Sequence, residues 1–335
     1  MLKIKLKTIL INFLVLIVLL IITDRLIPFF SKQISGDNDR YISLREHNPK
    51  MDVYIYEGDR KIRVRTDENG FIIGPNQNLS DSVDFIFLGG STTESFFVDE
   101  DKRFPYLSIK MLSDELNSDF VSLNGGVSGN NIYHSYIKLI SKVIEQKPRY
   151  VILMNAVNDY SYLNKYSSYF EGPRGPINEN KITVYNFLKS VKDYLIPNLY
   201  TSVRSVFLMT SLGSIPGGPD SLKVEEKSEN PIKDFERVLR VFIKTSIEFD
   251  IEPILMTQFN NYENEKILTS YEMNDYNQFN NSIRNISSEF NLKLIDLELL
   301  IPKKAEFFYD GGHLNNKGSI LASSIIKDFL KDNLK

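Results

Sequence analysis

Apolar and polar positions alternate in blocks from residue 84 onward, where short apolar runs are separated by longer segments with helical spacing. The runs predict strands at residues 85–88, 120–123, 150–154, 251–256 and 292–297, and the longer segments predict helices at residues 104–116, 132–146, 232–249, 271–290 and 317–330. Continuous apolar strands that alternate with helices indicate a parallel sheet covered on both faces. In such α/β folds, ligands bind beyond the carboxyl ends of the strands. The residues directly after each strand are therefore the first place to look for chemistry.

The first 30 residues have a different pattern. Three lysines precede an apolar run at residues 9–22, and a basic flank of this kind normally stays in the cytoplasm. Residues 8–30 reach the length of about 20 residues that a membrane span needs, provided that Asp24 and Arg25 lie in the interface. We therefore predict that residues 1–30 form a single-pass signal anchor or transmembrane helix in the cell membrane, with an extracytoplasmic catalytic domain.

Two other interpretations of this N-terminal segment are possible. A cleaved signal peptide would also combine a basic flank with an apolar run, but no small-x-small cleavage site follows the run. A buried helix would show a polar stripe, whereas apolar side chains here occupy all faces. Both alternatives are disfavoured, so we predict an uncleaved anchor.

The rest of the chain divides into an extension and a main domain. Residues 31–83 are polar and rich in turns, and alternation at residues 52–56 and 61–65 predicts a hairpin. We expect a β-rich extracytoplasmic extension that packs on the main domain, residues 84–335. An insertion at about residues 160–231 interrupts the strand–helix rhythm and follows the third strand. Insertions of this kind are often lids or binding loops, and residues 213–230 are predicted to be a surface loop.

Composition excludes several kinds of function. The chain has 40 Lys and Arg against 43 Asp and Glu, a net charge of −3, without a conspicuous basic cluster. We therefore expect no nucleic-acid partner. The chain has no cysteine, which rules out disulfides, thiolate metal sites and a cysteine nucleophile. A catalytic nucleophile would have to be another residue type.

The first strand is followed by Gly-Gly-Ser-Thr-Thr-Glu at residues 89–94. The glycine pair lets the backbone turn sharply and bring the hydroxyl of Ser91 to the top of the sheet. A helical turn that begins there directs backbone N–H groups to the same point, which favours negative charge. The segment suits a nucleophilic serine, and equally a helix N-cap in which Ser91 pairs with Glu94. Both interpretations stay open on this segment alone.

Two further strand ends carry groups that could stabilise an oxyanion. Residues 124–130 read Asn-Gly-Gly-Val-Ser-Gly-Asn, in which Gly129 could offer an unobstructed backbone N–H. Residues 155–159 read Asn-Ala-Val-Asn-Asp, in which the side-chain amide of Asn158 is a suitable oxyanion donor. Taken singly, each segment is also an ordinary turn sequence.

The last candidate segment reads Asp-Gly-Gly-His at residues 310–313. The chain has three histidines, and His313 is the one that lies in a glycine-flanked loop three residues after an aspartate. An aspartate can orient a histidine and stabilise its charged form, and this spacing can let the carboxylate of Asp310 reach Nδ1. The alternative is a surface histidine in a turn, with Asp310 solvated.

In this order and at these strand ends, the four segments resemble the conserved blocks of the SGNH (GDSL) hydrolase family. Residues 89–92 resemble the first block, residues 124–129 the second, residues 156–159 the third and residues 310–313 the fifth. The resemblance covers about residues 84–332 and implies a flavodoxin-like α/β/α sandwich of three layers with about five parallel strands. Gly90 stands where the first block has Asp, and Ala156 where the third block begins with Gly. Neither departure removes a catalytic group.

The resemblance also implies roles for single residues. Ser91 would be the nucleophile, His313 the general base and then the general acid, and Asp310 its orienting partner. The oxyanion hole would combine the N–H of Ser91, the N–H of Gly129 and the side-chain amide of Asn158. The implied reaction is acyl transfer through an acyl-serine, and it needs no metal or organic cofactor.

By the same analogy, the chain is expected to be a serine esterase that hydrolyses acyl esters, first of all O-acetyl esters of a surface or exported polysaccharide. Aromatic residues of the insertion, such as Tyr160 and Tyr169, could form a sugar-binding rim or pack in a core. An O-acyltransferase acting on a cell-surface glycan and a lipase or phospholipid acyl hydrolase are alternatives. A catalytically silent glycan-binding assembly protein is the non-enzymatic alternative, against which the intact Ser91, Asp310 and His313 argue.

Overall fold

The structure is a computed structural model, and it describes residues 2–30, 46–57, 60–75, 77, 82–164, 168–169, 230–261 and 270–334. The chain divides into two compact units, Met1–Ser43 with Pro173–Glu225, and Leu44–Gly172 with Glu226–Lys335. The first unit contains helix α1 (Leu2–Phe30). Among the residues that were described, none of the helices combines the length and apolar character that a membrane span requires. Most of the predicted insertion lies outside the described residues.

The described part of the second unit contains one sheet of five parallel strands, in the order β4-β3-β5-β6-β7. The strands are β3 (Phe85–Gly89), β4 (Ser122–Asn124), β5 (Tyr150–Met154), β6 (Glu252–Met256) and β7 (Lys293–Ile295). Every residue of β3, β4 and β5 is buried. Strands buried on both faces are continuously apolar, which is why the runs in the sequence predicted a parallel α/β sheet correctly.

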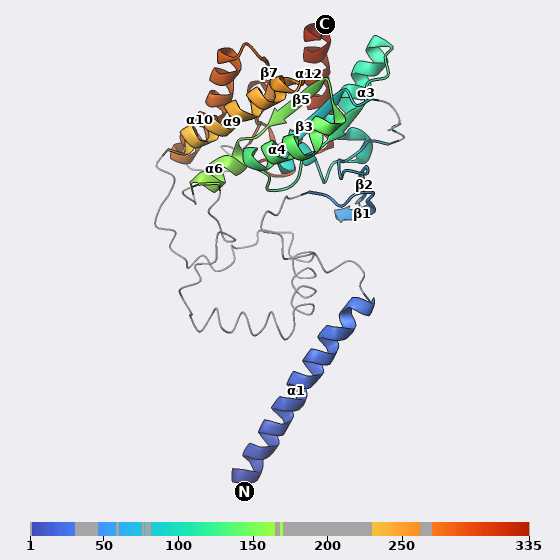
Figure 1. Cartoon of the computed structure of the whole chain (residues 1–335), viewed down its shortest axis with the longest axis vertical. Helices are drawn as coiled ribbons and strands as arrows, with labels where there is room; N and C mark the ends of the chain where they lie inside the picture. Colours follow the sequence, from blue (N-terminus) through green and yellow to red (C-terminus); the bar gives the residue numbers. More distant parts are fainter. Residues whose placement is uncertain are drawn as a thin grey trace. The chain divides into compact units, whose positions relative to one another are not determined.

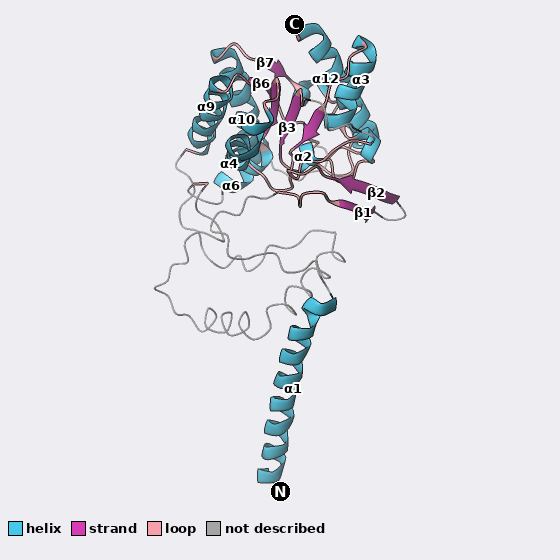
Figure 2. Ribbon diagram, turned by 45° about the vertical axis from the view of Figure 1, so that its right-hand side comes forward, coloured by secondary structure: helices cyan, strands magenta, loops and turns pink. Residues whose placement is uncertain are grey.

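Helices cover both faces of this sheet (Figures 1 and 2). Helices α4, α9 and α10 lie on one face, where Leu239 and Phe279 are in the core, and α3 and α12 lie on the other, where Ile109 and Ile326 are in the core. The layers are therefore α/β/α. The helices of the second unit are α2 (Ser91–Glu94), α3 (Phe104–Leu116), α4 (Ile132–Lys138), α5 (Ile144–Gln146), α6 (Val157–Leu163), α9 (Pro231–Glu248), α10 (Ser270–Glu289), α11 (Leu297–Leu300) and α12 (Asn316–Asn333), with 3₁₀ turns η1 (Glu100–Lys102) and η3 (Ala305–Phe307) and a π-helical segment η2 (Leu139–Val143).

The extension contributes an antiparallel hairpin of β1 (Asp52–Glu57) and β2 (Arg60–Arg65), as the alternation predicted. Ile62 and Val64 are buried, whereas Tyr54 and Tyr56 are exposed. The chain then reaches the edge of the sheet, where Ile72 and Asn124 exchange two backbone hydrogen bonds of 2.8 and 3.0 Å. This part of the extension is thereby joined to the end of β4.

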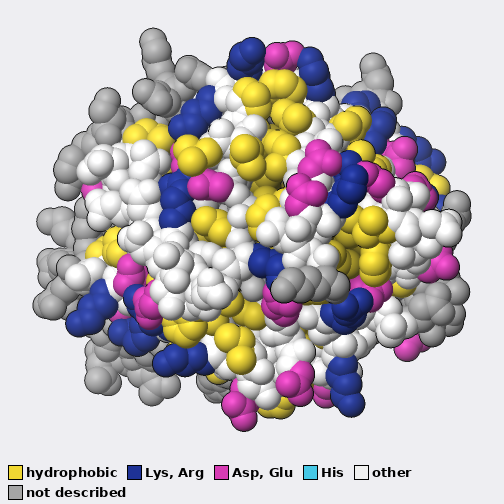
Figure 3. Space-filling model, turned by 90° about the horizontal axis from the view of Figure 1, so that it is seen from above, with side chains coloured by type: hydrophobic (Ala, Val, Ile, Leu, Met, Phe, Trp, Pro, Cys, Tyr) yellow, Lys and Arg dark blue, Asp and Glu magenta, His cyan; other side chains and the backbone are white. Residues whose placement is uncertain are grey.

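The described surface has mixed charge, in line with the near balance of acidic and basic residues. Figure 3 shows one face, on which basic and acidic side chains are interspersed among apolar ones. On that face, the described residues form no large area of one sign. Because the five strands are parallel, their carboxyl ends share one edge of the sheet, and the polar segments after β3, β4, β5 and β6 converge there.

Candidate active site

Ser91, His313 and Asp310 form a hydrogen-bonded row. Ser91 Oγ lies 2.7 Å from His313 Nε2, and His313 Nδ1 lies 2.8 and 2.9 Å from the two carboxylate oxygens of Asp310. If Nδ1 carries the proton and donates it to Asp310, Nε2 is left to accept the hydroxyl of Ser91. The imidazole is partly exposed, with 29% of its side-chain surface accessible. The row can therefore take a proton from a serine that solvent or a substrate can approach.

The turn after β3 explains why Ser91 is available to His313. Gly90 is the N-cap of α2, and no side chain caps this helix. The capping interpretation of Ser91 is therefore wrong, because its hydroxyl is directed to His313 instead. The four-residue helix ends at Ser95, which has a left-handed conformation with φ of 52°. Ser91 thus stands at the junction of a buried strand and a short helical turn.

The loop of residues 310–313 is closed by its own aspartate. Asp310 Oδ1 accepts the backbone N–H groups of Gly312 and His313, both at 2.8 Å. Burial raises the pKa of Asp310, but hydrogen bonds from the His313 ring and these N–H groups, with the charge of His313, outweigh burial and leave the pKa below its usual value. Asp310 is therefore ionised at neutral pH, and although 46% of its side chain is exposed, the carboxylate is bound to the His313 ring and to the backbone of its own loop.

Asn158 lies beside the turn that carries Ser91. Its Nδ2 donates a 2.8 Å hydrogen bond to the carbonyl oxygen of Asn130, which leaves a second amide hydrogen. A Cβ atom on Gly90 would lie only 2.4 Å from Asn158 Nδ2 and 2.9 Å from the Asn130 carbonyl oxygen. A side chain at residue 90 would therefore have to displace the Asn158 amide, and it would also press on the Asn130 carbonyl.

Gly129 has a left-handed conformation, with φ of +78°, which a glycine adopts without strain. Its two neighbours contact groups of the Ser91 turn and of the next strand end. The hydroxyl of Ser128 donates a short hydrogen bond to Glu94, and the carbonyl of Asn130 accepts the amide of Asn158. The segment after β4 is thus held against the segments after β3 and β5.

Two groups near the site were not singled out by the sequence. Gln258, after β6, contacts both Thr92 and Val157. His47, from the extension, lies with its Nε2 2.9 Å from Oε1 of the buried Glu94. Neither residue belongs to a local motif, since each acts on a partner far away in the sequence. The described residues contain no group of three or more His, Asp or Glu arranged to hold a metal ion.

An aromatic ring covers one face of the His313 imidazole. The ring of Tyr309 stacks on that of His313, with centroids 5.3 Å apart and an interplanar angle of 14°. Phe97 meets Tyr309 edge to face at 5.7 Å. Tyr309 is 40% exposed. Of the insertion residues, the described Tyr160 and Tyr169 are buried in the core, whereas residues 166 and 170 lie outside the described residues.

A second carboxyl group lies next to Asn158 but has a different environment. Asp159 is fully buried, and its Oδ1 accepts the backbone N–H of Ile132 at 3.0 Å and the hydroxyl of Tyr169 at 2.7 Å. Burial raises the pKa of Asp159 to about 7, although these hydrogen bonds oppose the rise. Asp159 holds the start of α4 through the backbone N–H of Ile132, and its two partners Ile132 and Tyr169 are not members of the row of Ser91, His313 and Asp310.

Comparisons with known proteins place this geometry in a family. The family model of GDSL-like lipase/acylhydrolase matches residues 85–326. A GDSL-like lipase from Parabacteroides merdae has a TM-score of 0.50 and 14% identity, with 77% of this chain and 99% of that chain covered. An acetyl xylan esterase, AlAXEase, has a TM-score of 0.44 and 17% identity over 76% of this chain and 100% of its own length. A search among curated proteins gave no match.

The family match covers the whole sheet, the Ser91 turn and the loop with Asp310 and His313. The fold of the lipase from Parabacteroides merdae agrees with this match. The chain therefore belongs to the GDSL-like lipase/acylhydrolase family and is an ester-hydrolysing serine hydrolase.

Proposed function

We propose that Ser91, His313 and Asp310 are the catalytic triad of this hydrolase. The observation that carries the proposal is the continuous row of hydrogen bonds from Ser91 Oγ through the imidazole to Asp310. A serine becomes a nucleophile when a base accepts its proton as attack begins, and the carboxylate orients and stabilises that base. All three groups are in hydrogen-bonding positions without any rearrangement.

In the acylation step, Ser91 Oγ attacks the carbonyl carbon of the ester while its proton moves to His313 Nε2. The carbonyl π electrons move to oxygen, and the resulting oxyanion is stabilised by N–H groups at Ser91 and Gly129 and by the second amide hydrogen of Asn158. Collapse of this intermediate breaks the bond to the alcohol oxygen, which takes the proton from His313. The acyl group then remains on Ser91.

In the deacylation step, His313 accepts a proton from a water molecule as that water attacks the acyl carbon. A second oxyanion forms and collapses, the bond to Ser91 Oγ breaks, and His313 returns the proton to the serine. The products are one carboxylic acid and one alcohol for each ester. Asp310 stays ionised throughout, as its lowered pKa requires.

The substrate proposed is an O-acetyl or other acyl ester on a surface or exported polysaccharide. The support is the aromatic side of the site, where Tyr309 stacks on the imidazole and Phe97 packs edge to face on Tyr309. Aromatic faces stack on apolar faces of ligands, and the C–H face of a sugar ring is such a face. A sugar that stacks there would have its acylated hydroxyl within the neighbourhood of Ser91.

The location proposed is the outer side of the cell membrane, with α1 as the anchor. Support comes from the three lysines that precede the apolar run at residues 9–22. Because the chain has no cysteine, a single introduced thiol reports its side of the membrane. A membrane-impermeant maleimide added to intact cells should label the exposed position in Tyr56→Cys and leave Lys3→Cys unlabelled. Labelling of Lys3→Cys alone would contradict the proposed orientation.

The triad is tested by p-nitrophenyl acetate hydrolysis with the parent, Ser91→Ala, His313→Ala and the matched control Ser288→Ala, which changes an exposed serine. The parent and the control should turn over the ester, and both triad variants should fall to background. Activity of Ser91→Ala would exclude Ser91 as the nucleophile. A folded parent that is inert toward water as acceptor but acetylates an added oligosaccharide would indicate acyl transfer instead.

A further inference from the structure

Gln258 is a buried glutamine that directly follows strand β6, at the same edge of the sheet as the triad. Only 3% of its surface is exposed. Its Oε1 accepts the backbone N–H of Val157 at 2.8 Å, and its Nε2 donates to Thr92 Oγ1 at 3.0 Å. Since a backbone N–H can only donate, Val157 fixes which end of the amide is oxygen. The two hydrogen bonds therefore use both ends of one side chain.

The two partners of Gln258 are immediate neighbours of catalytic groups. Thr92 follows Ser91, and Val157 precedes Asn158. The amide thus joins the turn that presents the nucleophile to the turn that presents the oxyanion donor. Thr92 is 4% exposed, so water does not readily replace the glutamine in this contact. Besides the direct pairing of β3 with β5 and the contact of Asn158 with the Asn130 carbonyl, this side chain from a third strand links the two turns directly.

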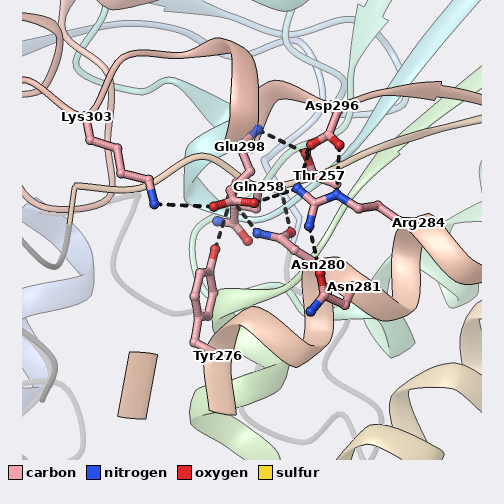
Figure 4. A network of polar contacts seen from close by, with 9 residues as sticks. All are labelled: Thr257, Gln258, Tyr276, Asn280, Asn281, Arg284, Asp296, Glu298 and Lys303. Atoms are coloured by element: carbon pink, nitrogen blue, oxygen red, sulfur yellow. Dashed lines mark hydrogen bonds and ion pairs between the residues drawn. The ribbon is translucent and has the colours of Figure 1, made fainter. Parts of the chain in front are cut away.

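The backbone of Gln258 is itself fixed by helix α10 (Figure 4). Its N–H donates to Asn280 Oδ1 at 2.9 Å, and its carbonyl oxygen accepts Asn280 Nδ2 at 3.0 Å and the hydroxyl of Tyr276 at 3.1 Å. Asn280 is fully buried. A side chain that holds two loops can keep them in place only if its own backbone is fixed, and this arrangement supplies that condition.

The preceding residue ties the same segment to strand β7. Thr257 Oγ1 donates to Asp296 at 2.7 Å and accepts the backbone N–H of Glu298 at 3.0 Å. Arg284 of α10 binds Asp296 through two hydrogen bonds of 2.7 Å. The strand end that carries Gln258 is therefore braced from α10 and from the loop after β7, as Figure 4 shows.

From this geometry we infer that Gln258 is a positioning residue, which sets the Asn158 amide relative to Ser91 and thereby shapes the oxyanion hole. The inference rests on the proposed roles of Ser91 and Asn158. Gln258 touches neither the substrate nor the triad, so it acts through Thr92 and Val157. Its loss should weaken stabilisation of the transition state more than binding of the substrate, because an oxyanion exists only after attack.

The test compares Gln258→Met, which keeps the length of the side chain but removes both hydrogen bonds, with Thr92→Val, Thr92→Ser and the matched control Asn281→Ala. Asn281 is an exposed amide on helix α10, next to Asn280. The full-length chain in detergent is assayed for kcat and KM with p-nitrophenyl acetate, and for the rate at which a fluorophosphonate reacts with Ser91. Thermal unfolding is followed in parallel.

Gln258→Met should lower kcat and the phosphonylation rate by about 10–100-fold with KM changed less than about threefold, since misplacement of about 1 Å costs this much. Thr92→Val should lower both by a smaller factor, Thr92→Ser should restore them, and the control should match the parent. The midpoint of the pH profile of kcat/KM should not move, because the contact does not reach His313.

Folded Gln258→Met that reacts as fast as the parent would overturn the inference alone. A rise in KM of about 10–100-fold with unchanged kcat would overturn it too, because that result indicates a role in substrate binding. If Gln258→Met does not fold, Thr92→Val decides, and an unchanged kcat there overturns the inference. A parent inert toward both the ester and the phosphonate would overturn the proposed function and the inference together.

Discussion

His47 Nε2 lies 2.9 Å from Glu94 Oε1, so a residue of the extension contacts the helical turn that carries Ser91. Glu94 is 3% exposed, and its other oxygen accepts the hydroxyl of Ser128, next to Gly129. The ring of His47 is parallel to that of Phe96 at 6.1 Å. The extension therefore supports, through Glu94, the segment after β4 that contains Ser128 and Gly129.

This contact predicts the effect of removing His47. His47→Ala leaves a buried carboxylate with one partner fewer, which should lower the free energy of unfolding by about 1–3 kcal/mol and kcat by several-fold. Urea denaturation and ester hydrolysis measure the two effects. His134→Ala is the matched control, because His134 Nδ1 accepts the backbone N–H of Asn131, the N-cap of α4. It should cost stability without lowering kcat, and an equal loss of kcat in both variants would contradict the prediction.

The close approach of Gly90 and Asn158 predicts that Gly90→Ala is folded but slow. An added methyl group must displace the Asn158 amide, and loss of one oxyanion donor costs about 10²–10³ in kcat. The same substitution in an Asn158→Ala background should have little further effect, because the displaced group is already absent. Full additivity of the two changes in steady-state kinetics would show that the methyl group acts elsewhere.

The buried carboxyl of Asp159 predicts a pH dependence of stability. Its pKa is raised to about 7, so the folded state binds this proton more tightly than the unfolded state, whose pKa is about 3.9. The associated stability is complete below about pH 4 and is lost as the pH rises to about 7, at up to about 1.4 kcal/mol per pH unit. Asp159→Asn keeps an acceptor oxygen and removes this loss.

Denaturant unfolding of the parent and of Asp159→Asn at pH 5 and pH 7.5 measures this difference. The free energy of unfolding of the variant should rise relative to that of the parent as the pH rises. Identical pH dependence of the two proteins would show that Asp159 titrates at an ordinary value in the folded state.

The stacked pair of Tyr309 and His313 predicts a change in substrate selectivity. Tyr309→Ala should raise KM for an acetylated oligosaccharide several-fold more than KM for p-nitrophenyl acetate, because the latter has no sugar ring. Tyr54→Ala, on the exposed face of the hairpin, is the control and should leave both values unchanged. An equal loss of kcat on both esters would indicate that Tyr309 orients the imidazole and binds no sugar.

Much of the fold could be predicted because strands that are buried on both faces are continuous apolar runs in the sequence. Strand β5 begins and ends where the sequence predicted, at Tyr150 and Met154. Strand β7 is shorter than predicted, because Asp296 is the N-cap of helix α11 and its carbonyl accepts the N–H groups of Leu299 and Leu300. Helix α6 was missed, since its seven residues are too few for helical periodicity to be visible.

The candidate site could be predicted only where the functional residues belong to short local motifs. The spacing of Asp310 and His313 predicted that the carboxylate can reach Nδ1, and it does so because the loop between them closes on itself. The capping interpretation of Ser91 failed because a contact from a distant loop competes with the local one. Gln258 left no trace in the sequence, since its partners Val157 and Thr92 are 101 and 166 positions away.

The hydrogen bond between Ser91 and His313 spans 222 positions of the chain. At a synthesis rate of about 5–20 residues per second, the base emerges from the ribosome about 10–45 seconds after the nucleophile. No nascent chain that ends before residue 313 can cleave an ester by this route. On the proposed roles of Ser91 and His313, esterase activity appears only after residue 313 has been synthesised, and a truncated product that ends before it is inert toward the acyl groups around it.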